Sequence, residues 1–252
     1  MRIAVHSDLH TEISPCRLEA LEWAELLILG GDIGNLQTLP EFFAQLREDA
    51  PHLPVLYILG NHDRYGMTRA EGVAAHRALA EAYDIRLLDD EAVIFGDVLF
   101  CGTTLWTDFA LASDAQASMQ WAGDTLPDFR EIRDDSGAPL TPETMRIWHA
   151  QSCDFLHHAL ATENVREKVV ISHFLPSHAL VAPEHGQDQE ALIKSAYWAS
   201  DLPALYPRAG FWIYGHSHTN INARIGNTSF ISNQRGARRK AAGYDEGYLL
   251  VI

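Results

Sequence analysis

Short clusters of aspartate, histidine and asparagine occur at five places along the chain, and they constrain the fold more than any other feature. Nearly all of them follow a continuous apolar run, which is typical of a strand buried on both faces. Their side chains offer only nitrogen and oxygen ligands, enough to hold two divalent cations side by side. In order, the clusters are Asp8-Leu9-His10, Gly31-Asp32, Asn61-His62-Asp63, Ser172-His173 and Gly215-His216-Ser217-His218.

The apolar runs alternate with helical stretches and predict a βαβαβ opening. Strands are expected at 3–5, 26–29, 55–59 and 248–252, and helices at 16–25, 39–49 and 68–83. Hairpins whose two-residue turn begins with Gly are expected at 92–101 and 223–231. The fold class predicted from this order is α/β (α+β), with two mixed β-sheets packed face to face and flanked by helices.

Size and charge restrict the class of protein. The 252 residues, of which 47% are hydrophobic, predict a single domain over 1–252. A formal net charge of −15 opposes binding to long nucleic acids, which depends on clustered Lys and Arg. The three cysteines are far apart and predict neither a disulfide framework nor a zinc ribbon. No signal peptide or membrane-spanning run is visible, so we expect a cytoplasmic protein without a membrane partner.

Two stretches lack the pattern of a regular core. The acidic segment, 103–140, contains scattered aromatic residues, and we expect an insertion or lid whose acidic residues form a solvated face. The second segment, 176–207, begins soon after His173 and is expected to be a loop on the substrate side. Long irregular segments inside compact domains are more often functional than idle.

The spacing within the clusters indicates how the ligands share a metal. Asp8 and His10 are two residues apart, so a strand that continued through them would place both side chains on one face. His216 and His218 repeat this spacing. Asp32 follows two glycines that allow a tight turn, and its two oxygens suit it to bridge cations about 3.5–4 Å apart.

The remaining cluster residues complete the set. Asn61 offers a neutral amide oxygen, and His173 follows a strand expected at 169–171. His62, one residue after Asn61, is expected to point elsewhere, which leaves it free for acid chemistry. Two divalent cations bring four positive charges and Asp8 and Asp32 return two negative ones, so a charge of about +2 is left to bind a phosphate. Carboxylate, amide and imidazole ligands without thiolate suit manganese, iron or zinc.

These motifs resemble the calcineurin-like metallophosphoesterase superfamily, whose blocks DxH, GD, GNH[DE], H and GHxH occur in the same order. The resemblance extends from Asp8 to His218 and so covers most of the chain. The stretches SDLHTE at 7–12, SAYWASDL at 195–202 and FISNQRG at 230–236 resemble a stand-alone bacterial branch of uncertain substrate. That branch usually has NPRGY where this chain has NQRGA.

The resemblance implies a four-layer αββα sandwich that holds two metal ions, with Asp32 as their bridge. It implies that a metal-bridging hydroxide attacks a small phosphate mono- or diester in line. His62 would protonate or stabilise the leaving oxygen, and Asp63 would orient the His62 ring. One metal would be held by Asp8, His10, Asp32 and His218, and the other by Asp32, Asn61, His173 and His216.

Substrate contacts are expected from residues outside the blocks. Arg235 is a candidate for binding phosphate, because a guanidinium matches phosphate geometry. His178 and His185 are candidates because they follow His173 in a loop. The other histidines are expected to be packing or surface residues, namely His6, His52, His76, His149, His157 and His158.

Three other functions are compatible with the same motifs. A cyclic-nucleotide phosphodiesterase or nucleotide pyrophosphatase would need nucleoside contacts, for which Trp106, Trp121 and Tyr65 are candidates. A nuclease would share the ligands, but the acidic balance and the lack of a basic stripe oppose it. A non-catalytic interaction scaffold would have lost ligands, and here every ligand is present. The expected partner is therefore a small phosphorylated substrate.

Overall fold

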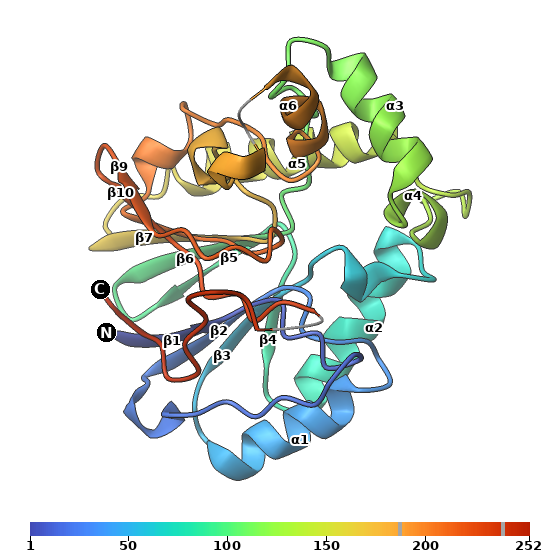
Figure 1. Ribbon diagram of the computed structural model, residues 1–252. Coiled ribbons are helices and arrows are strands. Elements are labelled where there is room, and N and C mark those ends of the chain that lie inside the picture. The colour runs from blue at the N-terminus through green and yellow to red at the C-terminus, as the bar shows by residue number, and fades with distance from the viewer. Residues whose placement is uncertain (186–187, 238–239) are drawn as a thin grey trace.

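Two β-sheets packed face to face form the centre of the protein (Figure 1). The computed structural model describes residues 1–185, 188–237 and 240–252. In the first sheet the strand order is β11-β1-β2-β3-β4, and every neighbouring pair is parallel except β11 with β1. Its strands are β1 (Arg2–His6), β2 (Leu26–Gly30), β3 (Val55–Ile58), β4 (Arg86–Leu88) and β11 (Leu249–Val251).

The second sheet has the strand order β5-β6-β7-β8-β10-β9. Its centre is parallel, and both edges are antiparallel because β5 with β6 and β9 with β10 form the two predicted hairpins. Its strands are β5 (Glu91–Phe95), β6 (Val98–Thr103), β7 (Glu167–Ser172), β8 (Phe211–Ile213), β9 (Ala223–Ile225) and β10 (Thr228–Ile231).

Helices cover the outer faces of both sheets, so the predicted sandwich of two mixed sheets flanked by helices is confirmed (Figure 1). The first sheet packs against α1 and α2, and the second against α5, while α3 and α4 lie beyond one edge. The helices are α1 (Leu39–Asp49), α2 (Arg69–Ala82), α3 (Ala115–Thr125), α4 (Asp128–Glu131), α5 (Pro142–Ala159) and α6 (Gln189–Ser195). Short 3₁₀ turns are η1 (Leu21–Trp23), η2 (His62–Arg64), η3 (His178–Leu180), η4 (Pro183–His185) and η5 (Tyr206–Arg208).

Alternating side chains along each strand build separate hydrophobic layers. On β2, Ile28 packs between the sheets with Phe100 of β6, whereas Leu27 and Leu29 face the side of α1. All these side chains are buried. Burial on both faces explains why the strands appear in the sequence as continuous apolar runs.

The helix expected over 16–25 is wrong. Only η1 forms there, because Ala20 has a left-handed backbone with φ of 55°, which an α-helix does not allow. The other two predicted helices are present as α1 and α2. Thr68 and Glu71 form a capping box that begins α2, in which each side chain accepts the other residue's N–H.

The acidic segment is a solvated face only in part. Asp114 and Asp124 are exposed, but Trp106 and Phe109 are fully buried and belong to the core between the second sheet and the helices that cover it. Asp128 is buried as well. The burial of this segment is set by the apolar residues that lie between its acidic ones.

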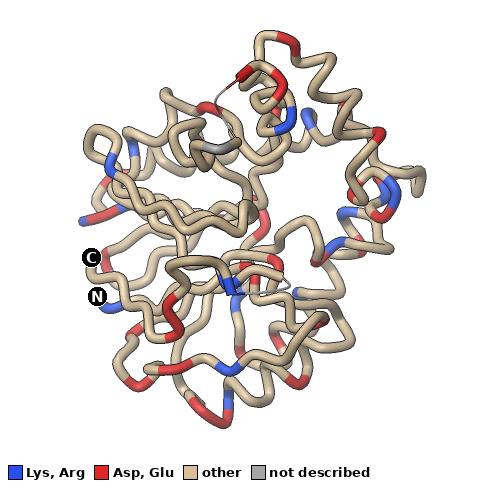
Figure 2. Tube along the Cα trace, in the orientation of Figure 1, with Lys and Arg blue, Asp and Glu red and all other residues tan. Residues whose placement is uncertain are grey.

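Charged residues are dispersed over the molecule. Lys and Arg number 19 against 34 Asp and Glu, and in Figure 2 the basic residues drawn stand singly or in small groups rather than along one stripe. This arrangement opposes sequence-independent binding to a nucleic-acid backbone. Among the described helices, none is both long enough and apolar enough to cross a bilayer.

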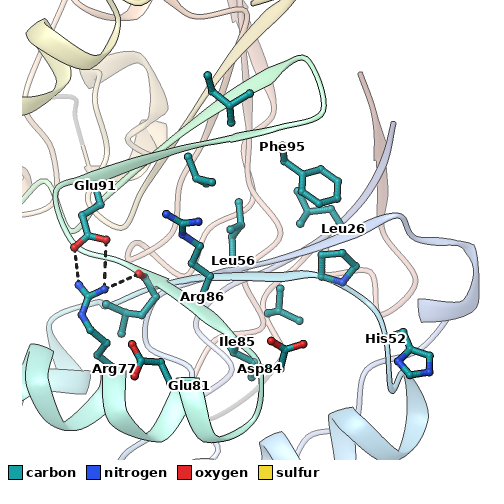
Figure 3. A pocket seen from close by; sticks show the side chains of 15 residues that line it. Leu26, His52, Leu56, Arg77, Glu81, Asp84, Ile85, Arg86, Glu91 and Phe95 are labelled. Atoms are coloured by element: carbon teal, nitrogen blue, oxygen red, sulfur yellow. Dashed lines mark hydrogen bonds and ion pairs between the residues drawn. The ribbon is translucent and has the colours of Figure 1, made fainter.

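A cavity of about 630 Å³ opens at the side of the sandwich, where β3, β4 and β5 meet (Figure 3). Arg77 and Glu91 form an ion pair of 2.7 Å in its wall. Leu26 and Val55, which line it, are the first residues of β2 and β3. The five clusters follow the opposite ends of their strands, so this cavity is separate from the predicted metal site.

The layer between the two sheets should dominate stability. We expect Ile28→Ala to lower the free energy of unfolding by about 2–5 kcal/mol, because it leaves a cavity in a closed core. Ile147, which is 58% exposed on α5, provides the control: Ile147→Ala should change stability by less than about 0.5 kcal/mol. Urea unfolding followed by circular dichroism measures both, and equal effects would contradict this account of the core.

Candidate metal centre

The loops after β1, β2, β3, β7 and β8 bring all five clusters to one end of the sandwich. Their ligand atoms form three overlapping groups, and within each group the atoms lie within 4.8 Å of one another. His10 and Asp32 each belong to two groups, so the groups form one continuous site. The groups are Asp8 with His10 and His218, His10 with Asp32 and His62, and Asp32 with His173 and His216.

The Asp32 carboxylate lies between the other ligands. Its Oδ1 accepts the backbone N–H of His62 at 2.9 Å. Its Oδ2 lies 3.2 Å from His173 Nε2 and 3.9 Å from His10 Nε2. Because these two histidines belong to different predicted metal positions, a single oxygen of Asp32 stands between the two positions.

Hydrogen bonds on the far side of two imidazole rings direct their Nε2 atoms inward. His10 Nδ1 donates to Glu12 Oε1 at 2.8 Å, and His173 Nδ1 donates to the Gly30 carbonyl at 3.0 Å. Both partners are acceptors, so Nδ1 carries the proton when either ring is neutral. Nε2 then has the lone pair that a metal needs, and His10 Nε2 lies 3.1 Å from His218 Nε2.

Three predicted ligand atoms are buried without a hydrogen-bond partner among the residues that the structure describes. They are Asn61 Oδ1, His173 Nε2 and His216 Nε2. An unsatisfied buried polar atom costs about 1–3 kcal/mol, and such atoms are rare in folded proteins. Together with Asp32 they are the set that the resemblance assigns to one metal, and this combination of donors fits manganese, iron or zinc.

Protons can balance the buried carboxylates when no cation is bound. Burial by itself lowers the pKa of His10, but the hydrogen bond to Glu12 and the Asp32 and Asp8 carboxylates raise it to about 9. Burial also lowers the pKa of His173, but the Asp32 carboxylate, with Asp8, raises it to about 10. Both rings are therefore protonated at neutral pH without metal, so a metal must displace their protons.

Five of the predicted ligands have a left-handed backbone, which costs roughly 1–2 kcal/mol for a residue with a side chain. Their φ angles are 52° for Asp8, 47° for His10, 53° for Asp32, 72° for His216 and 51° for His218. The strand geometry expected for Asp8 and His10 is wrong, because β1 ends at His6. These two side chains meet through the conformation of the loop after β1.

Contacts between the loops hold this conformation. Asp8 N–H donates to the Gly31 carbonyl at 2.9 Å, and His10 N–H donates to the Asp32 carbonyl at 3.0 Å. Gly60 leaves the space that the Asp32 carboxylate occupies, since a Cβ there would lie 2.1 Å from its Oδ1. The site therefore depends on Gly60, although this glycine has no side chain to offer as a metal ligand.

The contacts of Asp63 contradict its expected role. Its carboxylate accepts the N–H groups of Gly60 at 2.7 Å and Asp32 at 2.8 Å, and the Tyr57 hydroxyl at 3.0 Å. No hydrogen bond to the His62 ring is present within the described part of the chain. Asp63 holds the backbone of two ligand loops together instead of orienting that ring.

Arg235 is also used structurally. Its guanidinium donates to the carbonyls of Leu9, Ser14 and Pro15 and to Ser14 Oγ, at 2.6–3.2 Å. These bonds fasten the C-terminal segment to the loop after β1, and the expected phosphate contact of Arg235 stays a prediction. His178 is exposed on η3, and its contact with substrate stays a prediction.

Three residues that hold ligands were missed. Glu12 fixes the His10 ring, and Gln234 Oε1 accepts the His218 N–H at 2.6 Å. Both lie in stretches that carry the resemblance, SDLHTE and FISNQRG, so a signal existed. Asp128 Oδ1 accepts Asn61 Nδ2 at 3.0 Å, and nothing in the sequence distinguished Asp128 from its acidic neighbours.

Residues 1–115 match the family model of the calcineurin-like phosphoesterase superfamily domain. This match assigns the calcineurin-like phosphoesterase domain to the N-terminal part of the chain. Members of the superfamily are metal-dependent phosphoesterases, which implies a hydrolase that uses divalent metals. An uncharacterized protein of Acanthamoeba polyphaga mimivirus is 21% identical over 225 residues, which cover 83% of this chain and 78% of that protein.

Several solved structures share the fold of this chain. The phosphopantetheinyl hydrolase of Mycobacterium tuberculosis has a TM-score of 0.70 at 14% identity, with 94% of this chain and 89% of that chain covered. A putative 5'-nucleotidase of Staphylococcus aureus scores 0.51 at 16% identity, with 94% and 49% covered. A Thermus thermophilus protein scores 0.53 at 14% identity, with 94% and 90% covered.

The space left by Gly60 provides one test. We expect Gly60→Ala to displace the Asp32 carboxylate and to remove both metals, because that carboxylate contributes to both positions. Elemental analysis of the purified protein after manganese loading measures the metal content per chain. Gly72→Ala is the matched control, since a Cβ on Gly72 meets its nearest atom at an ordinary 3.6 Å. Full metal content in Gly60→Ala would show that this geometry is wrong.

The raised pKa values of His10 and His173 predict proton release on metal binding. At neutral pH both rings lose a proton to metal, so manganese affinity should rise by up to about tenfold per pH unit for each proton displaced. Calorimetric titrations in buffers of different ionisation enthalpy count the protons. An affinity that does not change between about pH 6 and 8 would contradict this account.

Proposed function

We propose that this protein is a dinuclear metal-dependent phosphoesterase that hydrolyses a small phosphate mono- or diester. The observation that carries the proposal is the position of Asp32 Oδ2 between His10 and His173, next to buried ligand atoms without partners. Every ligand of the motif set is present, which opposes a non-catalytic scaffold.

The metal ligands are divided as the resemblance implies. Asp8, His10, Asp32 and His218 would hold one cation, and Asp32, Asn61, His173 and His216 the other. When bound, two divalent cations neutralise charge on the phosphate oxygens and lower the pKa of the attacking water. Asp8 is held for this by the His216 N–H, which lies 3.1 Å from both its oxygens.

His62 is proposed to donate a proton to the leaving oxygen. Its backbone N–H bonds Asp32, while its half-buried ring stacks on Tyr65 with ring centroids 4.6 Å apart and a 25° angle between planes. The ring also meets His10 edge-on at 4.9 Å. His62 is thus held beside the ligands but outside both four-ligand sets.

A cavity of about 290 Å³ lies beside His62 and supports a small leaving group. Glu12, Asn35, Tyr65 and Met67 are among the residues that line it, and its described lining contains no Lys or Arg. A leaving group seated there would be small and without further phosphates, since no cation is present to neutralise them. Of the candidate nucleoside contacts, Trp106 is fully buried and unavailable, whereas Tyr65 lines this cavity, so a nucleotide substrate stays an alternative.

The role of His62 can be separated from metal binding. We expect His62→Gln to retain both metals and to lower kcat by roughly 10²–10⁴-fold, the usual scale for a general acid. Asp32→Ala is the contrasting variant and should lose metal and activity together. The measurements are metal content and turnover of a chromogenic phosphate ester with manganese, iron or zinc.

Two outcomes would contradict the proposal. Loss of metal in His62→Gln would reassign this residue as a ligand, because its ring lies within reach of His10 and Asp32. Unchanged turnover in Asp32→Ala would refute the dinuclear mechanism itself. A panel of monoesters, diesters and cyclic nucleotides then decides which bond is cleaved.

A further inference from the structure

The two irregular segments of the chain meet at one buried carboxylate. Asp128, the first residue of α4 in the acidic segment, is 1% exposed. Tyr197, from the second segment, donates its hydroxyl to Asp128 Oδ2 at 2.5 Å. Tyr65 donates to Oδ1 at 2.7 Å, and Asn61 Nδ2 donates to the same oxygen at 3.0 Å.

These contacts use both N–H groups of the Asn61 side-chain amide. Besides Asp128 Oδ1, Asn61 Nδ2 donates to the hydroxyl oxygen of Tyr197 at 3.4 Å. That oxygen can accept because the Tyr197 hydroxyl gives its own proton to Asp128. If the amide were turned round, its oxygen would face a carboxylate, which cannot donate when ionised. Asn61 Oδ1 is left buried and without a partner.

We propose that Asp128 is a positioning residue that fixes the Asn61 amide with its oxygen toward the metal position of His173 and His216. This inference rests on the proposed two-metal site. An amide held by no neighbour can present either its nitrogen or its oxygen, and only the oxygen binds a cation. Partners of this kind typically change metal affinity by 10–100-fold.

The energetic cost of Asp128 supports a role beyond packing. A buried carboxylate is expensive unless its lone pairs are used, whereas an apolar residue could fill the same space at lower cost. All three donors to Asp128 also touch the site. Asn61 is a predicted ligand, the Tyr65 ring stacks on His62, and the Tyr197 ring meets His216 edge-on at 5.1 Å.

Manganese binding by calorimetry tests the inference without using activity. The wild-type chain should bind two Mn²⁺ ions, and Asp128→Ala should weaken one of them by about 10–100-fold while the other stays within a few-fold. Asp124→Ala is the matched control, because it removes an exposed carboxylate from the same segment. Its manganese binding should equal that of wild type.

A double-mutant cycle with Asn61→Asp separates orientation from packing. A carboxylate presents an oxygen in either orientation, so Asn61→Asp should strengthen manganese binding when residue 128 is alanine. With Asp128 present, the same substitution places two carboxylates at hydrogen-bond distance and should weaken binding. We expect the effect of Asn61→Asp to differ by at least about tenfold between the two backgrounds.

The outcomes distinguish this inference from the proposed function. A wild-type chain that binds no manganese would overturn both. Two wild-type sites with unchanged affinities in Asp128→Ala, or equal effects of Asn61→Asp in both backgrounds, would overturn only the role of Asp128. If Asp128→Ala fails to fold by circular dichroism, Asp128→Leu decides, because it fills the space of the carboxylate and removes both oxygens that accept from Asn61 and the tyrosines. Unchanged affinity in that variant would overturn the inference.

Discussion

The position of one carboxylate, Asp32, determines the rest of the site. It is 2% exposed, and Asp8 nearby is fully buried, so two negative charges lie where solvation cannot stabilise them. Positive charge must neutralise these two carboxylates, either as protons on His10 and His173 or as metal ions. The pKa values of those two histidines show how strongly the carboxylates attract it.

The two sheets hold the loops of the site in a conformation that the loops alone would not keep. The left-handed backbone of five predicted ligands stores several kcal/mol of strain by the usual scale. The hydrogen bonds between the loops must offset this strain. Parallel neighbours in each sheet place the loops after β1, β2 and β3 side by side, and those after β7 and β8 opposite them. Buried strands fix the ends of each loop, so the strained residues cannot relax to an extended backbone conformation.

The sequence predicted the elements whose signals are local and repeated. Continuous apolar runs indicated the main strands, Gly-initiated turns indicated both hairpins, and the motifs indicated the candidate ligands that the structure brings together. Strands β4 and β8 were not predicted. The conformation of the loop after β1, the bonding of Asp63 and the burial of the acidic segment depend on contacts between distant residues. No spacing rule encodes such contacts, which is why strand geometry was wrongly expected for Asp8.

The acidic segment shows why composition misleads about function here. Most of its carboxylates face water, while the buried Asp128 accepts hydrogen bonds from two other parts of the chain, the loop that holds Asn61 and Tyr65 and the segment that holds Tyr197. Through Asn61 and Tyr197 it links both irregular segments to the same ligand loop. If the irregular segments contact substrate, any substrate that shifts them also acts on the Asn61 amide. Substrate recognition and metal retention would then be coupled through a single buried carboxylate, without any direct contact between substrate and ligand.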